Sequence, residues 1–157
     1  RIKFVEEVCD VVELCQTALS TAEYARRTQA IYQFQTPVSS LILKTDAQRL
    51  KQVLINLLSN AGKFTPSGFI RLAIKVNKED NCLEFSVTDT GCGIREEELP
   101  RIFRRFYRSE LVKDEEGVGI GLYLTREILQ EQGGYIKVSS VYGQGSKFSI
   151  YLPKNNF

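Results

Sequence analysis

The pattern of apolar and polar positions predicts one long helix near the middle of the chain, over residues 46–64. Asp46 is a suitable N-cap, and Pro66 and Gly68 follow the helix as stop signals. Between these ends, apolar residues recur at spacings of three and four, as on one face of a helix. They are Leu50, Val53, Leu54, Leu57, Leu58 and Ala61. We therefore expect this helix to pack one face into the core.

Alternating patterns elsewhere predict strands, with further helices between them. Two alternating runs joined by a polar loop predict a hairpin. Strands are expected at residues 30–35, 41–44, 69–76, 82–88, 135–140 and 146–152, and helices at 4–28, 95–103 and 120–132. Glu96, Glu97 and Glu98 would stand near the start of the helix over 95–103, where its dipole favours acidic side chains. Residues 106–116 lack periodicity and predict a loop long enough to suspect a function. This mixture predicts a two-layer α/β sandwich over a mixed sheet.

Length and composition narrow the classes of protein. A chain of 157 residues, 43% hydrophobic and 25% charged, fits one globular domain over residues 1–157. A net charge of +2 gives no argument for a nucleic-acid partner. No apolar run is long enough to span a membrane. The chain begins at Arg1 and shows no signal peptide, so we expect it to be part of a longer protein.

The cysteine and histidine counts bear on catalysis. No two of the four cysteines have CxxC spacing, which favours free thiols in a reducing compartment over a zinc site. The chain has no histidine. This excludes Ser-His-Asp and Cys-His nucleophilic catalysis within it, and any histidine general base.

Asn56, Asn60 and Lys63 form a polar stripe on the 46–64 helix. At about 100° per residue, the stripe lies roughly 120° from the centre of the apolar face. Amide oxygens suit a hard cation such as Mg²⁺, and an ammonium group one turn later suits phosphate. A half-exposed helix with incidental asparagines would give the same pattern, so this helix alone leaves both interpretations open.

Asp89 ends the second hairpin strand at a sharp turn through Gly91 and Gly93. An aspartate at such a turn often stabilises only the turn itself. The alternative is a buried carboxylate that accepts a hydrogen bond from an exocyclic amino group. Adenine offers that amino group, whereas guanine carries a carbonyl at the same place.

Two further features follow along the chain. Aromatic and arginine residues gather around the start of the predicted loop. They could be ordinary packing with solvated charge, or a docking surface that also supplies an arginine to a phosphate. They are Phe103, Arg104, Arg105, Phe106, Tyr107 and Arg108. Glycine then recurs at residues 117, 119 and 121, where a helix is predicted to start. This pattern is typical of an anion-binding site and also of a hinge that binds no ligand.

In this order, the four features resemble the N, G1, F and G2 boxes of the ATP-binding domain of sensor histidine kinases, in the GHKL group with gyrase and MutL. The resemblance covers essentially the whole chain, including the closing GGYIKVSS and GQGSKFSIYLP. It implies the Bergerat (GHKL) fold, a two-layer α/β sandwich whose mixed, mostly antiparallel sheet packs against about three helices, with a lid over ATP. It also implies binding of Mg²⁺ and ATP, with transfer of the γ-phosphate to a histidine on a separate dimerisation domain.

The resemblance also implies residue roles. Asn60 would hold Mg²⁺ with Asn56 in support, Lys63 would reach the phosphates, and Asp89 would hold the adenine amino group. Arg108 would approach the terminal phosphate. By these roles, the expected catalytic residues are Asn56, Asn60, Lys63 and Arg108. The expected nucleotide contacts are Asn60, Lys63, Phe64, Asp89, Gly91, Gly93, Ile94, Tyr107, Arg108, Gly117, Gly119, Ile120, Gly121 and Leu122.

Asn56 separates the branches of the group. Gyrase-like ATPases carry a glutamate one turn before the metal asparagine, as general base for water. A neutral amide cannot take a proton at pH 7, so slow hydrolysis and transfer to a better nucleophile are expected. Glu116 and Val118 depart from the usual second glycine box, which has glycine and threonine there. They keep two alternatives open, a degenerate nucleotide-binding or protein-interaction module and, more weakly, a GHKL-type ATPase.

The expected partners follow from the same resemblance. They are the chain's own dimerisation and histidine-phosphotransfer domain, within a homodimer, and a downstream response regulator. No nucleic acid and no membrane contact are expected for this fragment. A cytoplasmic location is expected for it, and the sequence leaves open whether the parent protein is anchored in a membrane.

Overall fold

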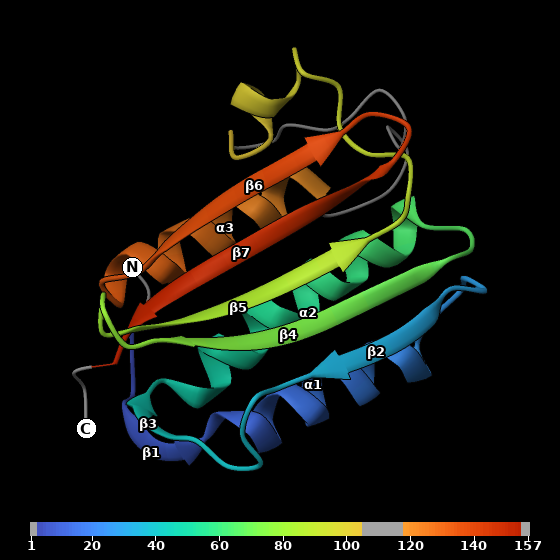
Figure 1. Ribbon diagram of the computed structural model, residues 1–157. Helices are drawn as coiled ribbons and strands as arrows, with labels where there is room; N and C mark the ends of the chain where they lie inside the picture. Colours follow the sequence, from blue (N-terminus) through green and yellow to red (C-terminus); the bar gives the residue numbers. More distant parts are fainter. Residues whose placement is uncertain (1–2, 105–117, 155–157) are drawn as a thin grey trace.

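The computed structural model describes residues 3–104 and 118–154. Its main sheet has five strands in the order β2-β4-β5-β7-β6. These strands are β2 (Ile31–Gln35), β4 (Phe69–Asn77), β5 (Cys82–Asp89), β7 (Gly145–Pro153) and β6 (Tyr135–Val141). β2 and β4 are parallel, whereas the other neighbours are antiparallel. Helices α1 (Val11–Tyr24), α2 (Ala47–Phe64) and α3 (Val118–Glu131) cover one face of the sheet (Figure 1). The predicted two-layer α/β sandwich with a mixed sheet is confirmed.

The core lies between the sheet and the helix layer. Alternate positions of β4 and β5 point toward the helices and are fully or almost fully buried. They pack over the apolar face of α2, where Leu54, Leu57 and Leu58 are equally buried. Full burial of such a side chain stabilises the fold by about 1.5–3 kcal/mol. Cys15 of α1 lies in the same core, and burial raises its pKa to about 12, so this thiol packs as an apolar group.

The central helix α2 begins where its sequence predicts. The Asp46 carboxylate accepts a hydrogen bond of 3.1 Å from the Arg49 amide, which caps the helix. Its other oxygen accepts a hydrogen bond of 2.8 Å from the Val5 amide. One buried carboxylate therefore holds both the first turn of α2 and the segment before β1 (Glu7–Asp10).

The helix predicted over residues 4–28 is wrong at its start. β1 pairs in antiparallel fashion with β3 (Ile42–Thr45) in a separate two-stranded sheet. The helix begins only at Val11, because Asp10 acts as its N-cap and accepts a hydrogen bond of 3.0 Å from the Val12 amide. Asp10 also accepts hydrogen bonds from the Leu41 amide and the Ser40 hydroxyl. These bonds lower the pKa of Asp10, and the bond from Leu41 has the larger effect.

The helix predicted over residues 95–103 is also wrong, because only the 3₁₀ turn η1 (Leu99–Arg101) forms there. Pro100 contributes to this, because it has no backbone N–H to donate to the carbonyl four residues earlier in an α-helix. The other predicted strands and helices within the described residues are found with small shifts at their ends. None of the described helices is at once long and apolar enough to cross a bilayer.

Candidate functional site

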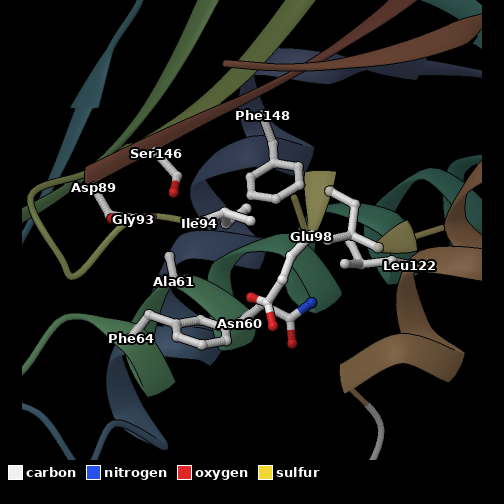
Figure 2. Close-up of a pocket in the computed structure, with 11 residues that line it drawn as sticks. Asn60, Ala61, Phe64, Asp89, Gly93, Ile94, Glu98, Leu122, Ser146 and Phe148 are labelled. Atoms are coloured by element: carbon white, nitrogen blue, oxygen red, sulfur yellow. The ribbon is translucent and has the colours of Figure 1, made fainter. Parts of the chain in front are cut away.

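A cavity lies between the C-terminal half of α2 and the ends of β5 and β7 (Figure 2). Its volume is about 30 Å³, well below the roughly 300 Å³ or more of typical ligand pockets. A ligand larger than a water molecule or two can therefore enter only if lining side chains move. The lining residues are Asn60, Ala61, Phe64, Asp89, Gly93, Ile94, Glu98, Ile102, Leu122, Ser146 and Phe148.

Asp89 lies at the end of β5 with only 5% of its surface exposed. Its carboxylate accepts a hydrogen bond of 2.9 Å from the Gly91 amide. Burial raises the pKa of Asp89 above its ordinary value. Hydrogen bonds from backbone amides oppose the rise, and the bond from Gly91 has the largest effect among them. Ser146 is its direct partner on β7 and lines the same cavity. This arrangement presents a buried acceptor to an amino group of a ligand.

Asn60 reaches the cavity from α2 and is 8% exposed. Its Nδ2 atom is buried and has no hydrogen-bond partner in the described part of the chain. A buried polar atom without a partner is uncommon and costs free energy, which suggests that a ligand supplies the missing partner. The oxygen and nitrogen of such an amide exchange places when the side chain flips, and an amide oxygen is a good ligand for Mg²⁺. The site chemistry therefore fits this cation.

The turn after Asp89 packs tightly at two glycines. A Cβ atom at Gly91 would collide with the backbone carbonyl of Phe64 at the end of α2. Gly93 has φ +74°, and a Cβ there would collide with the carbonyl of Val141 in the β6–β7 hairpin. Of these glycines, Gly93 lines the cavity, whereas Gly91 holds the turn against α2. The sharp turn predicted from the sequence is confirmed.

Two members of the predicted polar stripe lie in other grooves. Asn56 lines an open groove together with Lys3 and Arg49, and exposed Lys63 lines another with Arg26. The helical spacing is as predicted, but among the described residues the cavity is lined by Asn60 and not by its two neighbours on the stripe.

The predicted lid residues are only partly described. Leu122 on α3 is buried and lines the cavity. Gly119, Ile120 and Gly121 belong to the first turn of α3, which Val118 begins. The remaining predicted residues lie outside the described part of the chain: Arg105, Phe106, Tyr107, Arg108, Glu116 and Gly117.

Five lining residues were not among the site residues expected from the sequence: Ala61, Glu98, Ile102, Ser146 and Phe148. Ser146 and Phe148 lie two residues apart on β7 and face the same side of the sheet. In the sequence, only this core-facing position near the start of the strand could have indicated that they line the cavity. Glu98 was expected only near the start of a helix whose dipole favours acidic side chains, yet it is 7% exposed and lines the cavity.

Comparison with known proteins gives a consistent assignment. A family model described as histidine kinase-, DNA gyrase B- and HSP90-like ATPase matches residues 45–156. The adaptive-response sensory kinase SasA of Synechococcus sp. (strain JA-3-3Ab) is 38% identical over 98% of this chain and 40% of its own length. The sensor histidine kinase WalK of Bacillus subtilis is 30% identical over 96% of this chain and 25% of its own length.

The circadian input-output histidine kinase CikA of Synechococcus elongatus is 40% identical over 72% of this chain and 15% of its own length. The chain thus spans less than half the length of these relatives. Among solved structures, the catalytic domain of histidine kinase ThkA has a TM-score of 0.82 and 28% identity over 96% of this chain and 99% of its own. Full-length ShkA in complex with AMPPNP has a TM-score of 0.79 and 26% identity, over 97% of this chain and 32% of that one. This chain belongs to the family of histidine kinase-, DNA gyrase B- and HSP90-like ATPases, as an ATP-binding catalytic domain of the sensor histidine kinase type.

Proposed function

We propose that this domain binds ATP with Mg²⁺ in the cavity between α2 and the end of β5, and that it transfers the γ-phosphate to a histidine of a separate dimerisation domain. The observation that carries the proposal is that Asn60 and Asp89 line one cavity although they come from different elements. A metal-binding amide and a buried acceptor for an amino group are the two groups that this substrate requires.

At the adenine end, Asp89 accepts a hydrogen bond from the exocyclic amino group of the base. Phe64 and Ile94 border the same cavity and supply apolar contact to the ring. Gly93 borders the space for the base, and Gly91 holds the turn against the end of α2. Guanine would present a carbonyl to the Asp89 carboxylate, so two acceptors would face each other without a proton, and GTP is rejected.

At the phosphate end, Asn60 holds Mg²⁺, which neutralises phosphate charge when bound, and Asn56 supports it. Lys63 is exposed on the same helix and reaches the phosphates with its flexible side chain. Arg108 approaches the terminal phosphate and Tyr107 the nucleotide. Gly119, Ile120 and Gly121 in the first turn of α3 cap the phosphates together with the preceding Gly117, and Leu122 borders the same cavity.

The residue types favour phosphotransfer over hydrolysis. Asn56 stands where a general base for water would be needed, and an amide does not accept a proton at neutral pH. The chain has no histidine, so the phosphoacceptor belongs to another domain. We propose the dimerisation and phosphotransfer domain of the same homodimeric protein as this partner, and a response regulator as the next acceptor.

The proposal is tested in two steps. Calorimetry should detect binding of ADP and of a non-hydrolysable ATP analogue in the presence of Mg²⁺, with the GTP analogue weaker by at least about tenfold. γ-Labelled ATP should then label a supplied dimerisation domain that bears the histidine. Asp89→Asn should weaken ATP binding, whereas the control Asp80→Asn in the exposed β4–β5 loop should not.

Each step has an outcome that contradicts the proposal. Equal binding of the ATP and GTP analogues would refute the role of Asp89. Nucleotide binding without label transfer would favour the alternative of a binding module without phosphotransfer, for which Glu116 and Val118 argue. Rapid phosphate release without an acceptor would favour an ATPase.

A further inference from the structure

Glu98 is a buried carboxylate in the wall of the cavity. The residue is 7% exposed, whereas the preceding Glu96 and Glu97 are exposed. It occupies the N-cap position of η1 but makes no capping hydrogen bond with its side chain. In Figure 2 the Glu98 side chain extends from the loop before η1 into the cavity, toward the Asn60 amide. The Glu98 side chain therefore forms part of the wall of the ligand space.

The Asn60 amide provides a second, independent sign of a ligand at this end of the cavity. Its Nδ2 atom is buried and no described group pairs with it, so Glu98 does not satisfy it. An amide oxygen and a carboxylate together form a donor set of hard oxygen atoms, which attracts a divalent cation. The same carboxylate repels phosphate oxygens at short range, because both groups carry negative charge.

Because the cavity is narrow, the negative charge of Glu98 lies close to any nucleotide that enters. A space of about 30 Å³ cannot hold a nucleotide beside the present Glu98 side chain. Any nucleotide that enters must therefore either displace this carboxylate or bind against it. A triphosphate without a cation meets repulsion in both cases, whereas a metal-bound triphosphate brings the positive charge that the carboxylate prefers.

We propose that Glu98 couples metal binding to nucleotide binding: beside Asn60 in the cavity wall, its carboxylate favours the divalent cation and disfavours the free triphosphate. This inference rests on the proposed function, since it concerns the same substrate. It assigns to Glu98 a task apart from that of Asp89, whose carboxylate serves the amino group of the base. Glu98 therefore sets the dependence of affinity on Mg²⁺ without setting the choice of base.

The test measures dissociation constants by calorimetry with a non-hydrolysable ATP analogue, once with Mg²⁺ and once with EDTA. The quantity of interest is the ratio of the EDTA value to the Mg²⁺ value. Glu98→Gln keeps the shape and removes the charge, and it should lower this ratio by about tenfold, with tighter binding in EDTA and weaker binding in Mg²⁺. The matched control Glu97→Gln removes the same charge from an exposed neighbour and should leave the ratio unchanged.

A second variant guards against a folding defect. Glu98→Asp keeps the charge but withdraws it by one methylene, and its ratio should lie between those of the wild type and Glu98→Gln. An unchanged ratio in a folded Glu98→Gln protein, or an equal loss of affinity with and without Mg²⁺, would overturn the inference while leaving the proposed function intact. If the wild-type protein binds the analogue in neither buffer, both the inference and the proposed function fall.

Discussion

The Cys92 amide donates a hydrogen bond of 3.1 Å to the carbonyl oxygen of Phe64. This bond ties the turn after Asp89 to the last turn of α2. Asn60 lies one helical turn before Phe64, and Asp89 lies three residues before Cys92. The two polar side chains are therefore held at the wall of one cavity by a short backbone link, although 28 residues separate the bonded pair in the sequence.

Replacing Asn60 with alanine should separate function from stability. The variant loses the amide oxygen for Mg²⁺, so affinity for the ATP analogue in Mg²⁺ should fall by at least about tenfold and phosphotransfer should be abolished. The free energy of unfolding should change by less than about 1 kcal/mol, because the lost Nδ2 group made no hydrogen bond in the described part of the chain. Urea unfolding and calorimetry measure the two effects.

The control for this experiment is Ser59→Ala, which alters the exposed neighbour on the same helix. It should leave both nucleotide affinity and the unfolding free energy nearly unchanged. Undiminished phosphotransfer by Asn60→Ala would show that Asn60 is not the metal ligand.

The raised pKa of Asp89 makes nucleotide affinity depend on pH. A protonated carboxyl group is a poor acceptor for the amino group of adenine, so affinity should fall as the pH is lowered through the pKa of Asp89, which lies above the ordinary 3.8. The Asp89→Asn variant should lack this step and keep only the pH dependence of the phosphates. Calorimetric titrations over a pH series, with both proteins, measure the difference. Parallel profiles would contradict the prediction.

Asp89 should affect folding stability with the opposite sign. Its folded-state pKa is raised, so the folded protein holds the proton more tightly than the unfolded chain. The stabilising contribution is therefore complete below the unfolded pKa of about 3.8 and is lost as the pH rises through the folded pKa. Relative to the wild type, Asp89→Asn should gain unfolding free energy on going from acidic to neutral pH. Urea unfolding at the two pH values tests this.

Gly91→Ala should disturb the link between the turn and α2. The added methyl group would collide with the backbone carbonyl of Phe64, which cannot move without disrupting the helix end. We expect a loss of about 1–3 kcal/mol in unfolding free energy, with weaker ATP binding. Gly62→Ala is the matched control, since its methyl group would stand 3.1 Å from the Tyr32 hydroxyl, the mobile end of a side chain. Equal effects of the two substitutions would refute the steric explanation.

Local signals made α2 and the β4–β5 hairpin predictable from the sequence. The Asp46 cap, the apolar repeat and the polar hairpin loop each act between residues close in the chain, so no knowledge of distant contacts was needed. Asn60 and Asp89 could be singled out for the same reason, since each has an unusual residue type at a marked place on its own element.

Features that depend on distant partners were missed. Residues 7–10 carry no helix breaker, and only pairing with β3 makes them a strand. Likewise, three consecutive glutamates look alike in the sequence, and the packing of the loop before η1 buries Glu98 alone among them. Helical spacing placed Asn56 and Asn60 on one stripe, but the neighbouring strands decide which part of the stripe borders the cavity.

The double use of the Asp46 carboxylate has a mechanical consequence. Since the same side chain anchors the Val5 amide and caps α2, tension applied to the backbone ahead of β1 is carried into the first turn of this helix. A helix transmits axial load as a stiff rod, and Asn60 sits near the far end of this one. A displacement of the segment before β1 would therefore be passed along α2 to Asn60, which lines the cavity.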